Sequence, residues 1–161
     1  MNTKKSIVAA ALPLAVGAVA VSVLAAPAAT AGVPAQGTFT VRAQPGSDVS
    51  LDLGKPGFSA GDQDLMTAHL LYRGAQVGRL VGRCTNIRLG GGSLDEICDF
   101  DLVISGSEII ASGPVHSTPQ GPGTFRLAIL GGTGRYVGVG GSIAVTATQT
   151  ASFPIAVSLQ R

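Results

Sequence analysis

The chain offers few side chains that commonly carry out chemistry: its 161 residues include two cysteines, two histidines and no tryptophan. His69 is the candidate catalytic residue, because an unperturbed imidazole titrates near neutral pH and can act as an acid or a base. An interior histidine that only satisfies hydrogen bonds is the alternative that the sequence leaves open. His69 and His116 are expected on opposite faces of a sheet, so we predict no metal site.

A glycine-rich run at residues 131–138, GGTGRYVG, could present successive backbone N–H groups to a phosphate. A phosphate-binding loop of this kind is followed by a helix. Here residues 142–146 alternate between small and apolar side chains, which is typical of a strand. We therefore interpret the run as a structural turn and predict no cofactor. Arg135 and Tyr136 within it are candidates to contact a ligand or a neighbouring subunit.

The two cysteines predict a hairpin. Cys84 and Cys98 flank residues 89–93, LGGGS, and Gly91 is their midpoint. If these strands pair about that turn, residues whose numbers sum to 182 face each other, and the cysteines lie opposite. A cross-strand disulfide follows in an exported protein, with two buried thiols as the alternative. The closed loop spans 15 residues, for which chain entropy predicts roughly 3 kcal/mol of stabilisation.

The same register assigns faces to the two strands. Arg83 falls opposite Asp99, so this charged pair must lie outside. The inner face then carries apolar side chains together with Asn86 and Glu96, which face each other beside the turn. The ligand-binding candidates on this face are Leu80, Asn86, Glu96, Phe100 and Leu102. A wet rim is the alternative interpretation of the Asn86–Glu96 pair.

A second predicted turn, at residues 73–76, extends the sheet upstream. It pairs His69 with Leu80 and Thr67 with Gly82, which predicts that Thr67 and His69 share the inner face. The outer face then carries six apolar residues: Met66, Leu70, Tyr72, Val81, Val103 and Ile110. So much apolar surface predicts a homotrimer or homodimer, or else cover by the N-terminal strand or a loop.

Short alternating segments separated by glycine-bearing turns predict an all-β sandwich or barrel without helices. We expect strands near residues 37–43, 48–53, 64–72, 77–88, 95–105, 108–116, 124–130, 141–149 and 153–160. No linker divides them, so residues 32–161 are expected to form one domain.

The first 31 residues have the features of a signal peptide. Lys4 and Lys5 precede an apolar run at residues 7–24, and Ala29-Thr30-Ala31 is a cleavage site of small residues. We expect a secreted protein with no segment that spans a membrane after cleavage. From residue 32 onward nine basic side chains balance nine acidic ones, which does not favour a nucleic-acid partner.

Four segments resemble the allene oxide cyclase and dirigent family: GDQDLMTAHLLYRGAQVGRLVGRC (61–84), SGPVH (112–116), FRLAILGGTGRYVGVGGSIAV (125–145) and FPIAVSLQR (153–161). The resemblance implies an eight-stranded antiparallel closed barrel of calycin-type architecture. It also implies a homotrimer with a hydrophobic unsaturated or phenolic ligand in the lumen.

The resemblance also implies positions within the site. Cys84 matches the barrel cysteine of the family, and His69 takes the place of an asparagine that binds substrate in the cyclases. Phe39 stands where the cyclases carry a glutamate on the first strand, so the acid-base chemistry of that cyclisation lacks one of its groups. Phe39 and Val41, on this strand, complete the set of ligand-binding candidates.

These features lead to one expected function and two alternatives. The expected function is a barrel that binds a small molecule and, if it is an enzyme, steers its cyclisation or coupling without a cofactor, by holding it in one conformation. The first alternative is a carrier of a hydrophobic ligand that performs no catalysis. The second is a structural or surface-interaction protein whose barrel is filled by side chains.

Overall fold

The computed structural model describes residues 32–148 and 150–161. The predicted signal peptide, residues 1–31, lies outside the described residues. No helix in these two ranges has the length and hydrophobicity needed to cross a membrane.

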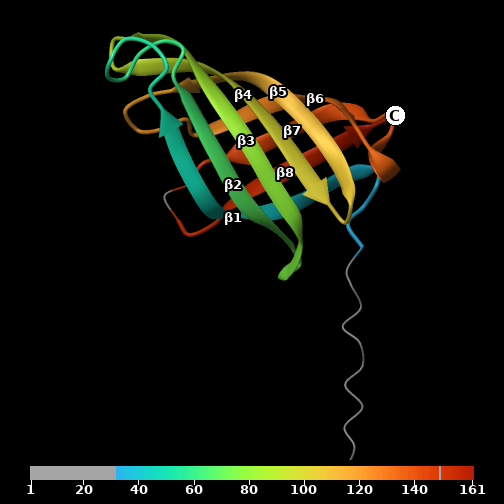
Figure 1. Cartoon of the computed structure of the whole chain (residues 1–161). Coiled ribbons are helices and arrows are strands. Elements are labelled where there is room, and N and C mark those ends of the chain that lie inside the picture. Colours follow the sequence, from blue (N-terminus) through green and yellow to red (C-terminus); the bar gives the residue numbers. More distant parts are fainter. Residues whose placement is uncertain (1–31, 149) are drawn as a thin grey trace, which may run out of the picture.

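The described residues form an antiparallel closed barrel of eight strands, in which each strand pairs with the next and the last pairs with the first (Figure 1). This confirms the predicted fold class. The elements are β1 Gly37–Leu51, β2 Gln63–Tyr72, β3 Ala75–Gly90, β4 Ser93–Ile104, β5 Ser107–Ser117, β6 Thr124–Gly132, the 3-10 turn η1 Gly134–Tyr136, β7 Gly140–Thr146 and β8 Phe153–Gln160.

Alternation of side chains explains why these segments form one curved sheet. In β8, Ile155, Val157 and Leu159 are buried, while the residues between them are more exposed. Two of the predicted strands, 37–43 and 48–53, are one strand, β1. An irregularity between Pro45 and Asp48 bends it, and it pairs with β8 before the bend and with β2 on both sides of it.

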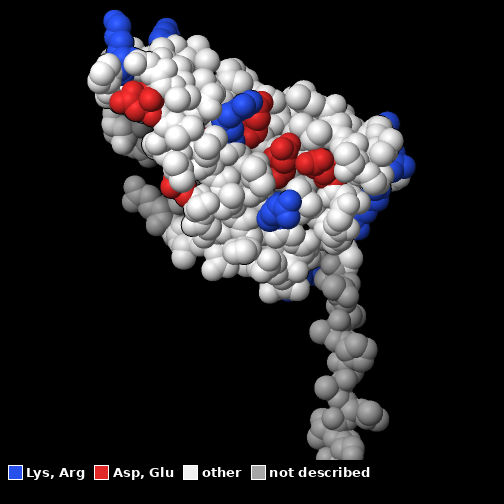
Figure 2. Space-filling view, in the orientation of Figure 1, with Lys and Arg blue, Asp and Glu red and all other residues white. Residues whose placement is uncertain are grey.

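The predicted cysteine hairpin is confirmed. Cys84 of β3 faces Cys98 of β4, and the two sulfur atoms form a disulfide. Arg83 faces Asp99 on the outside, and the guanidinium lies 2.8 Å from the carboxylate. Figure 2 shows acidic and basic side chains in small groups on one face of the barrel.

The prediction that Thr67 and His69 face the interior is wrong. Thr67 pairs with Val81 and His69 with Arg79, and both side chains are exposed. The Nδ1 atom of His69 lies 3.2 Å from the side-chain amide of Gln76, on the outside of the barrel. His69 therefore does not point into the lumen, and its catalytic role stays a prediction without support from this position.

A β-bulge is the physical cause of this error. The turn between β2 and β3 consists of Arg73 and Gly74, both with positive φ, so Tyr72 pairs with Ala75. The register then shifts by one residue between Leu70 and Leu71. Val77 is skipped in this pairing, so the extra residue lies in β3, and the shift places Ala68 instead of an odd-numbered residue opposite Leu80.

The same shift removes part of the apolar outer surface. Leu70 and Tyr72 were expected outside but are buried, whereas Val81 and Ile110 are 42% and 38% exposed as expected. The homo-oligomer therefore stays a prediction, and fewer exposed apolar residues support it than the sequence suggests.

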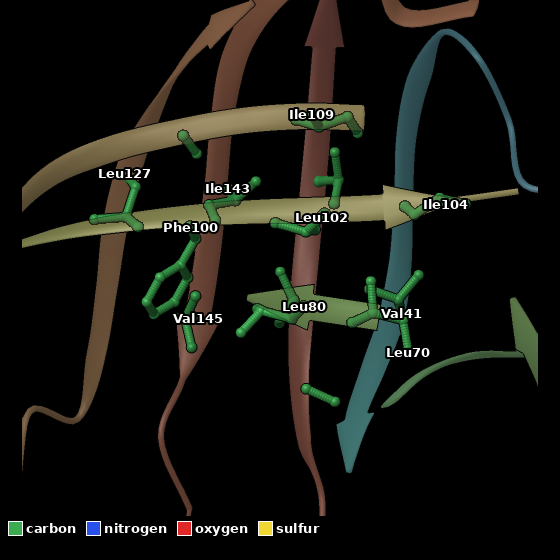
Figure 3. Close-up of a cluster of buried hydrophobic side chains, with 14 of the residues drawn as sticks. Val41, Leu70, Leu80, Phe100, Leu102, Ile104, Ile109, Leu127, Ile143 and Val145 are labelled. Carbon is green, nitrogen blue, oxygen red and sulfur yellow. The ribbon is translucent and has the colours of Figure 1, made fainter. Parts of the chain in front are cut away.

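Aliphatic and aromatic side chains fill one half of the barrel (Figure 3). The largest fully buried ones include Val41, Leu70, Leu80, Leu102, Ile104, Ile109, Leu127 and Ile143. The end of this half is closed by residues 33–35 and η1. Tyr136 of η1 is completely buried, and its hydroxyl donates to the carbonyl oxygen of Pro34 at 3.5 Å.

Glycine is required where η1 packs against the strands. A Cβ at Gly132 would lie 2.3 Å from the carbonyl oxygen of Glu108, and one at Gly134 would lie 2.4 Å from Oγ of Ser107. Gly134 also has a φ of 58°, which favours glycine. The glycine-rich run is therefore a structural turn that closes one end of the barrel.

Candidate ligand pocket

A pocket of about 410 Å³ lies inside the opposite end of the barrel. Side chains from all eight strands line it, together with residues 147, 148 and 150 between β7 and β8. The lining residues are Pro45, Asp64, Met66, Cys84, Leu94, Glu96, Cys98, Phe100, Val115, Ser117, Pro122, Phe125, Val145, Ala147, Thr148, Thr150 and Phe153. The volume lies in the range of small-molecule sites.

The predicted site residues fall into three groups. Glu96 and Phe100 line this pocket, together with the disulfide. Leu80 and Thr67 border a smaller cavity of about 150 Å³ beside the bend of β1. Phe39, Val41 and Leu102 lie in the filled half, where Phe39 packs edge-on against Tyr72 at 6.4 Å between ring centres.

Asn86 does not line this pocket; it borders another cavity, of about 210 Å³, and holds the long loop between β1 and β2. Its side-chain amide donates to the carbonyl oxygen of Ser59 at 3.3 Å, and its backbone N–H donates to the carbonyl oxygen of Asp62 at 2.9 Å. Asp62 in turn accepts backbone N–H groups of Ser59 and Leu53. These hydrogen bonds lower the pKa of the Asp62 carboxyl.

Glu96 is the buried carboxylic acid of the pocket. Glu96 is 9% exposed, and one of its carboxylate oxygens lies within 4.8 Å of both sulfur atoms of the disulfide. Burial raises the pKa of the Glu96 carboxyl, and the negative charge of Asp64 raises it further. The hydroxyl of Ser117, which donates to Oε2 at 3.2 Å, lowers this pKa and so opposes the shift. Glu96 can therefore change its protonation state closer to neutral pH than an exposed glutamate.

Most of the remaining wall is apolar and aromatic. Phe100 and Phe125 pack edge to face, with ring centres 6.3 Å apart and planes at 72°. Phe153 and Met66 are partly buried against the core and also line the pocket. Such a wall favours flat, apolar molecules, because aromatic rings pack well on one another.

Glu96 and the two cysteines are the one group among the described residues whose atoms are close enough to hold a metal ion. The sulfur atoms are bonded to each other in the disulfide. A disulfide supplies no thiolate, which is the form of cysteine that binds metals. The oxidised site is therefore unsuited to a metal.

Several residues that line the pocket are not among those that the sequence predicted. Val115 and Ser117 continue the inward alternation of Ile109 and Ala111 along β5 and could have been found by extending it. The sequence pattern places Met66 on the outer face, because it does not reveal the extra residue at Val77 of β3.

No family model matches the chain, and no curated protein matches its sequence. Solved structures do resemble it. A pyocyanin demethylase shares 28% sequence identity with a TM-score of 0.67, over 76% of this chain and 99% of the demethylase. A pterocarpan synthase dirigent protein shares 14% identity with a TM-score of 0.53, over 74% of this chain and 79% of the other, which is a likeness of fold alone.

The order and closure of the strands, together with these two likenesses, place the chain in a fold class. The chain has the eight-stranded barrel fold of allene oxide cyclase and dirigent-like proteins.

Proposed function

We propose that this protein binds a small, flat and mostly apolar molecule in the open end of its barrel. The supporting observation is the pocket of about 410 Å³ with three phenylalanines and one buried carboxylic acid among its lining residues. Aromatic walls with a few polar groups are typical of sites for small organic molecules. The open volume also speaks against a barrel that side chains fill completely.

The pyocyanin demethylase supports the class of ligand. It is named for pyocyanin, a phenazine, which is a fused aromatic ring system. We therefore infer that the ligand is a polycyclic aromatic compound. Glu96 would hydrogen-bond to a heteroatom of the ring system, and the apolar walls would hold the rings.

Binding of the parent compound phenazine tests the proposal. Titration should give saturable binding that the variant Ala147→Trp weakens at least about tenfold, because the added indole occupies the rim of the pocket. Ala128→Trp is the matched control, since Ala128 is exposed on β6. Circular dichroism would verify that both variants fold. Equal binding by the two variants would contradict the proposed location.

We further propose that the pocket steers a reaction of its ligand, by holding the ring system in one orientation toward the reacting partner. A carrier that performs no catalysis would bind equally well, so binding alone does not separate the two roles. The stereochemistry of the products separates them. A racemic mixture of products at saturating protein would support the carrier role, whereas enrichment of one enantiomer would support steering.

We also propose that residues 1–31 are a signal peptide and that the protein is secreted. A disulfide is consistent with this, because such bonds persist in oxidising compartments. Mass spectrometry of the exported protein should find Gly32 as the first residue. A protein that keeps its first 31 residues would contradict the proposal.

A further inference from the structure

The ionisable side chains that line the pocket all have the same sign. Among the described lining residues they are Asp64 and Glu96, and none of these residues is a lysine, arginine or histidine. The chain from residue 32 onward has equal numbers of acidic and basic side chains. The acidic character is therefore a property of the pocket and not of the whole domain.

The nearby arginines are paired elsewhere. Arg83 contacts Asp99 and Arg88 contacts Asp95, in ion pairs with exposed side chains on the outer face of β3 and β4. Within the described residues no ion pair includes Glu96 or Asp64. Among the described residues, the two carboxyl groups of the pocket thus form no ion pair with a basic side chain.

Hydrogen bonds neutralise these carboxyl groups only in part. Glu96 accepts a bond from the hydroxyl of Ser117, and Asp64 accepts one from the hydroxyl of Ser50. A hydroxyl donates one proton and carries no net charge. Both sites therefore keep the capacity to attract a positive charge in the lumen.

The aromatic walls favour the same sign. Phe100, Phe125 and Phe153 line the pocket, and the face of a phenyl ring is electronegative. A cation within about 6 Å of such a ring is attracted to its face, and the attraction strengthens as water is excluded. An anion would be repelled by the carboxylates and by the electronegative faces of the rings.

We propose that the ligand of this pocket is a flat aromatic cation, with its positive charge delocalised over a nitrogen heterocycle and balanced by Glu96. This inference rests on the proposed function and narrows it from polycyclic aromatics in general to their cationic members. A delocalised cation fits such a pocket better than an ammonium group, because it costs less to remove from water.

Three phenazines that share one ring system test the charge preference: N-methylphenazinium, phenazine and phenazine-1-carboxylate. At pH 8 we expect the cation to bind at least about tenfold tighter than the neutral compound. The carboxylate should bind more weakly than both. Calorimetry or fluorescence quenching would give the three dissociation constants.

The variant Glu96→Gln identifies the responsible group. It should reduce the preference for the cation by about tenfold and change the affinity for neutral phenazine little. Glu108→Gln makes the same chemical change on β5, outside the pocket lining, and should leave all three affinities unchanged. Circular dichroism would show whether both variants fold.

Proton release gives a readout that a purely structural role would not change. The groups that surround Glu96 are Asp64 on β2, the disulfide between β3 and β4, and Ser117 on β5. Asp95, with Arg88 and His116, lies on the outer face. A cation stabilises the ionised carboxyl, so its affinity should rise with pH and binding should release a proton.

Two results would overturn the inference and leave the proposed function standing. One is tighter binding of neutral phenazine or the carboxylate than of the cation. The other is a preference for the cation that survives in Glu96→Gln. If none of the three phenazines binds, the proposed function fails and the inference fails with it.

Discussion

The two ends of the barrel are built from the same eight strands but are filled differently. At the closed end, Tyr136 and Val139 pack over a layer of aliphatic side chains, and Val33 completes the seal. At the open end, the strands carry Phe125, Phe153 and smaller residues, and a pocket of about 410 Å³ remains.

The difference shows how one small barrel can be both stable and hollow. Burial of apolar side chains and close packing stabilise the closed half. The open half gains less from packing, because part of its lumen is empty. There a covalent bond joins β3 to β4 at Cys84 and Cys98, and hydrogen bonds tie the long loop to Asn86.

Truncation of core side chains should separate the two ends most strongly. Leu102 is fully buried in the closed half, and Leu102→Ala should lower the free energy of unfolding by about 3–5 kcal/mol. Met66→Ala, on the pocket wall, should cost about 1–2 kcal/mol, because it enlarges an existing space. Urea denaturation of both variants measures the difference. Equal losses would show that the two halves are packed alike.

Loss of the disulfide should affect mainly the open half. The double variant Cys84→Ala and Cys98→Ala removes a cross-link over a sequence separation of 14 residues. The expected loss of stability is about 3 kcal/mol. Hydrogen exchange should rise around the turn between β3 and β4 and stay low at the closed end. A loss below about 1 kcal/mol, or faster exchange at η1, would contradict this division.

A methyl group added at the closed end tests how tightly that end is packed. Gly132→Ala should cost about 2 kcal/mol or more, because the new Cβ overlaps the carbonyl oxygen of Glu108. Gly140→Ala is the matched control, since no atom lies within 4 Å of the added carbon. It should change stability by less than about 0.5 kcal/mol. Thermal unfolding of the two variants would show whether the contact decides the outcome.

The smallest expected effect is the pH dependence of the open end. The pKa of Glu96 is raised in the folded protein, so its contribution to stability is full below the unfolded pKa. That contribution is lost as the pH rises through the folded pKa. Glu96→Gln should therefore be at least as stable as the wild type at neutral pH and should lose less stability between pH 4 and neutrality. A steeper loss in the variant would show that the ionised carboxylate is the favoured form.

The sequence predicted the fold class and one hairpin in detail. Cys84, Cys98 and the glycines between them define a local register that agrees with Arg83 opposite Asp99. Glu96 and Phe100 followed from that register, and both line the pocket. Local turns and alternation carry this information, because paired residues in a hairpin are close in the sequence.

His69 and Thr67 could not be placed in the same way. Their faces depend on a bulge at Val77 of β3, opposite Leu70 and Leu71, which shifts the pairing of the two strands by one residue. Val77 stands between Gln76 and Gly78, so no apolar alternation reveals the extra residue. The buried Leu70 and the exposed His69 thus result from how β3, with its bulge, pairs with β2.

By itself, the sequence determined the inner face of β3 and β4 and the sulfur–sulfur bridge, because the residues of one hairpin specify both. Only the tertiary structure decided which end of the barrel is hollow. That property depends on side chains from every strand meeting at one level of the lumen, and η1 closes the other end through contacts between residues about a hundred positions apart. No local sequence pattern shows which side chains of different strands meet, so the pocket and its acidic lining form only when the barrel closes.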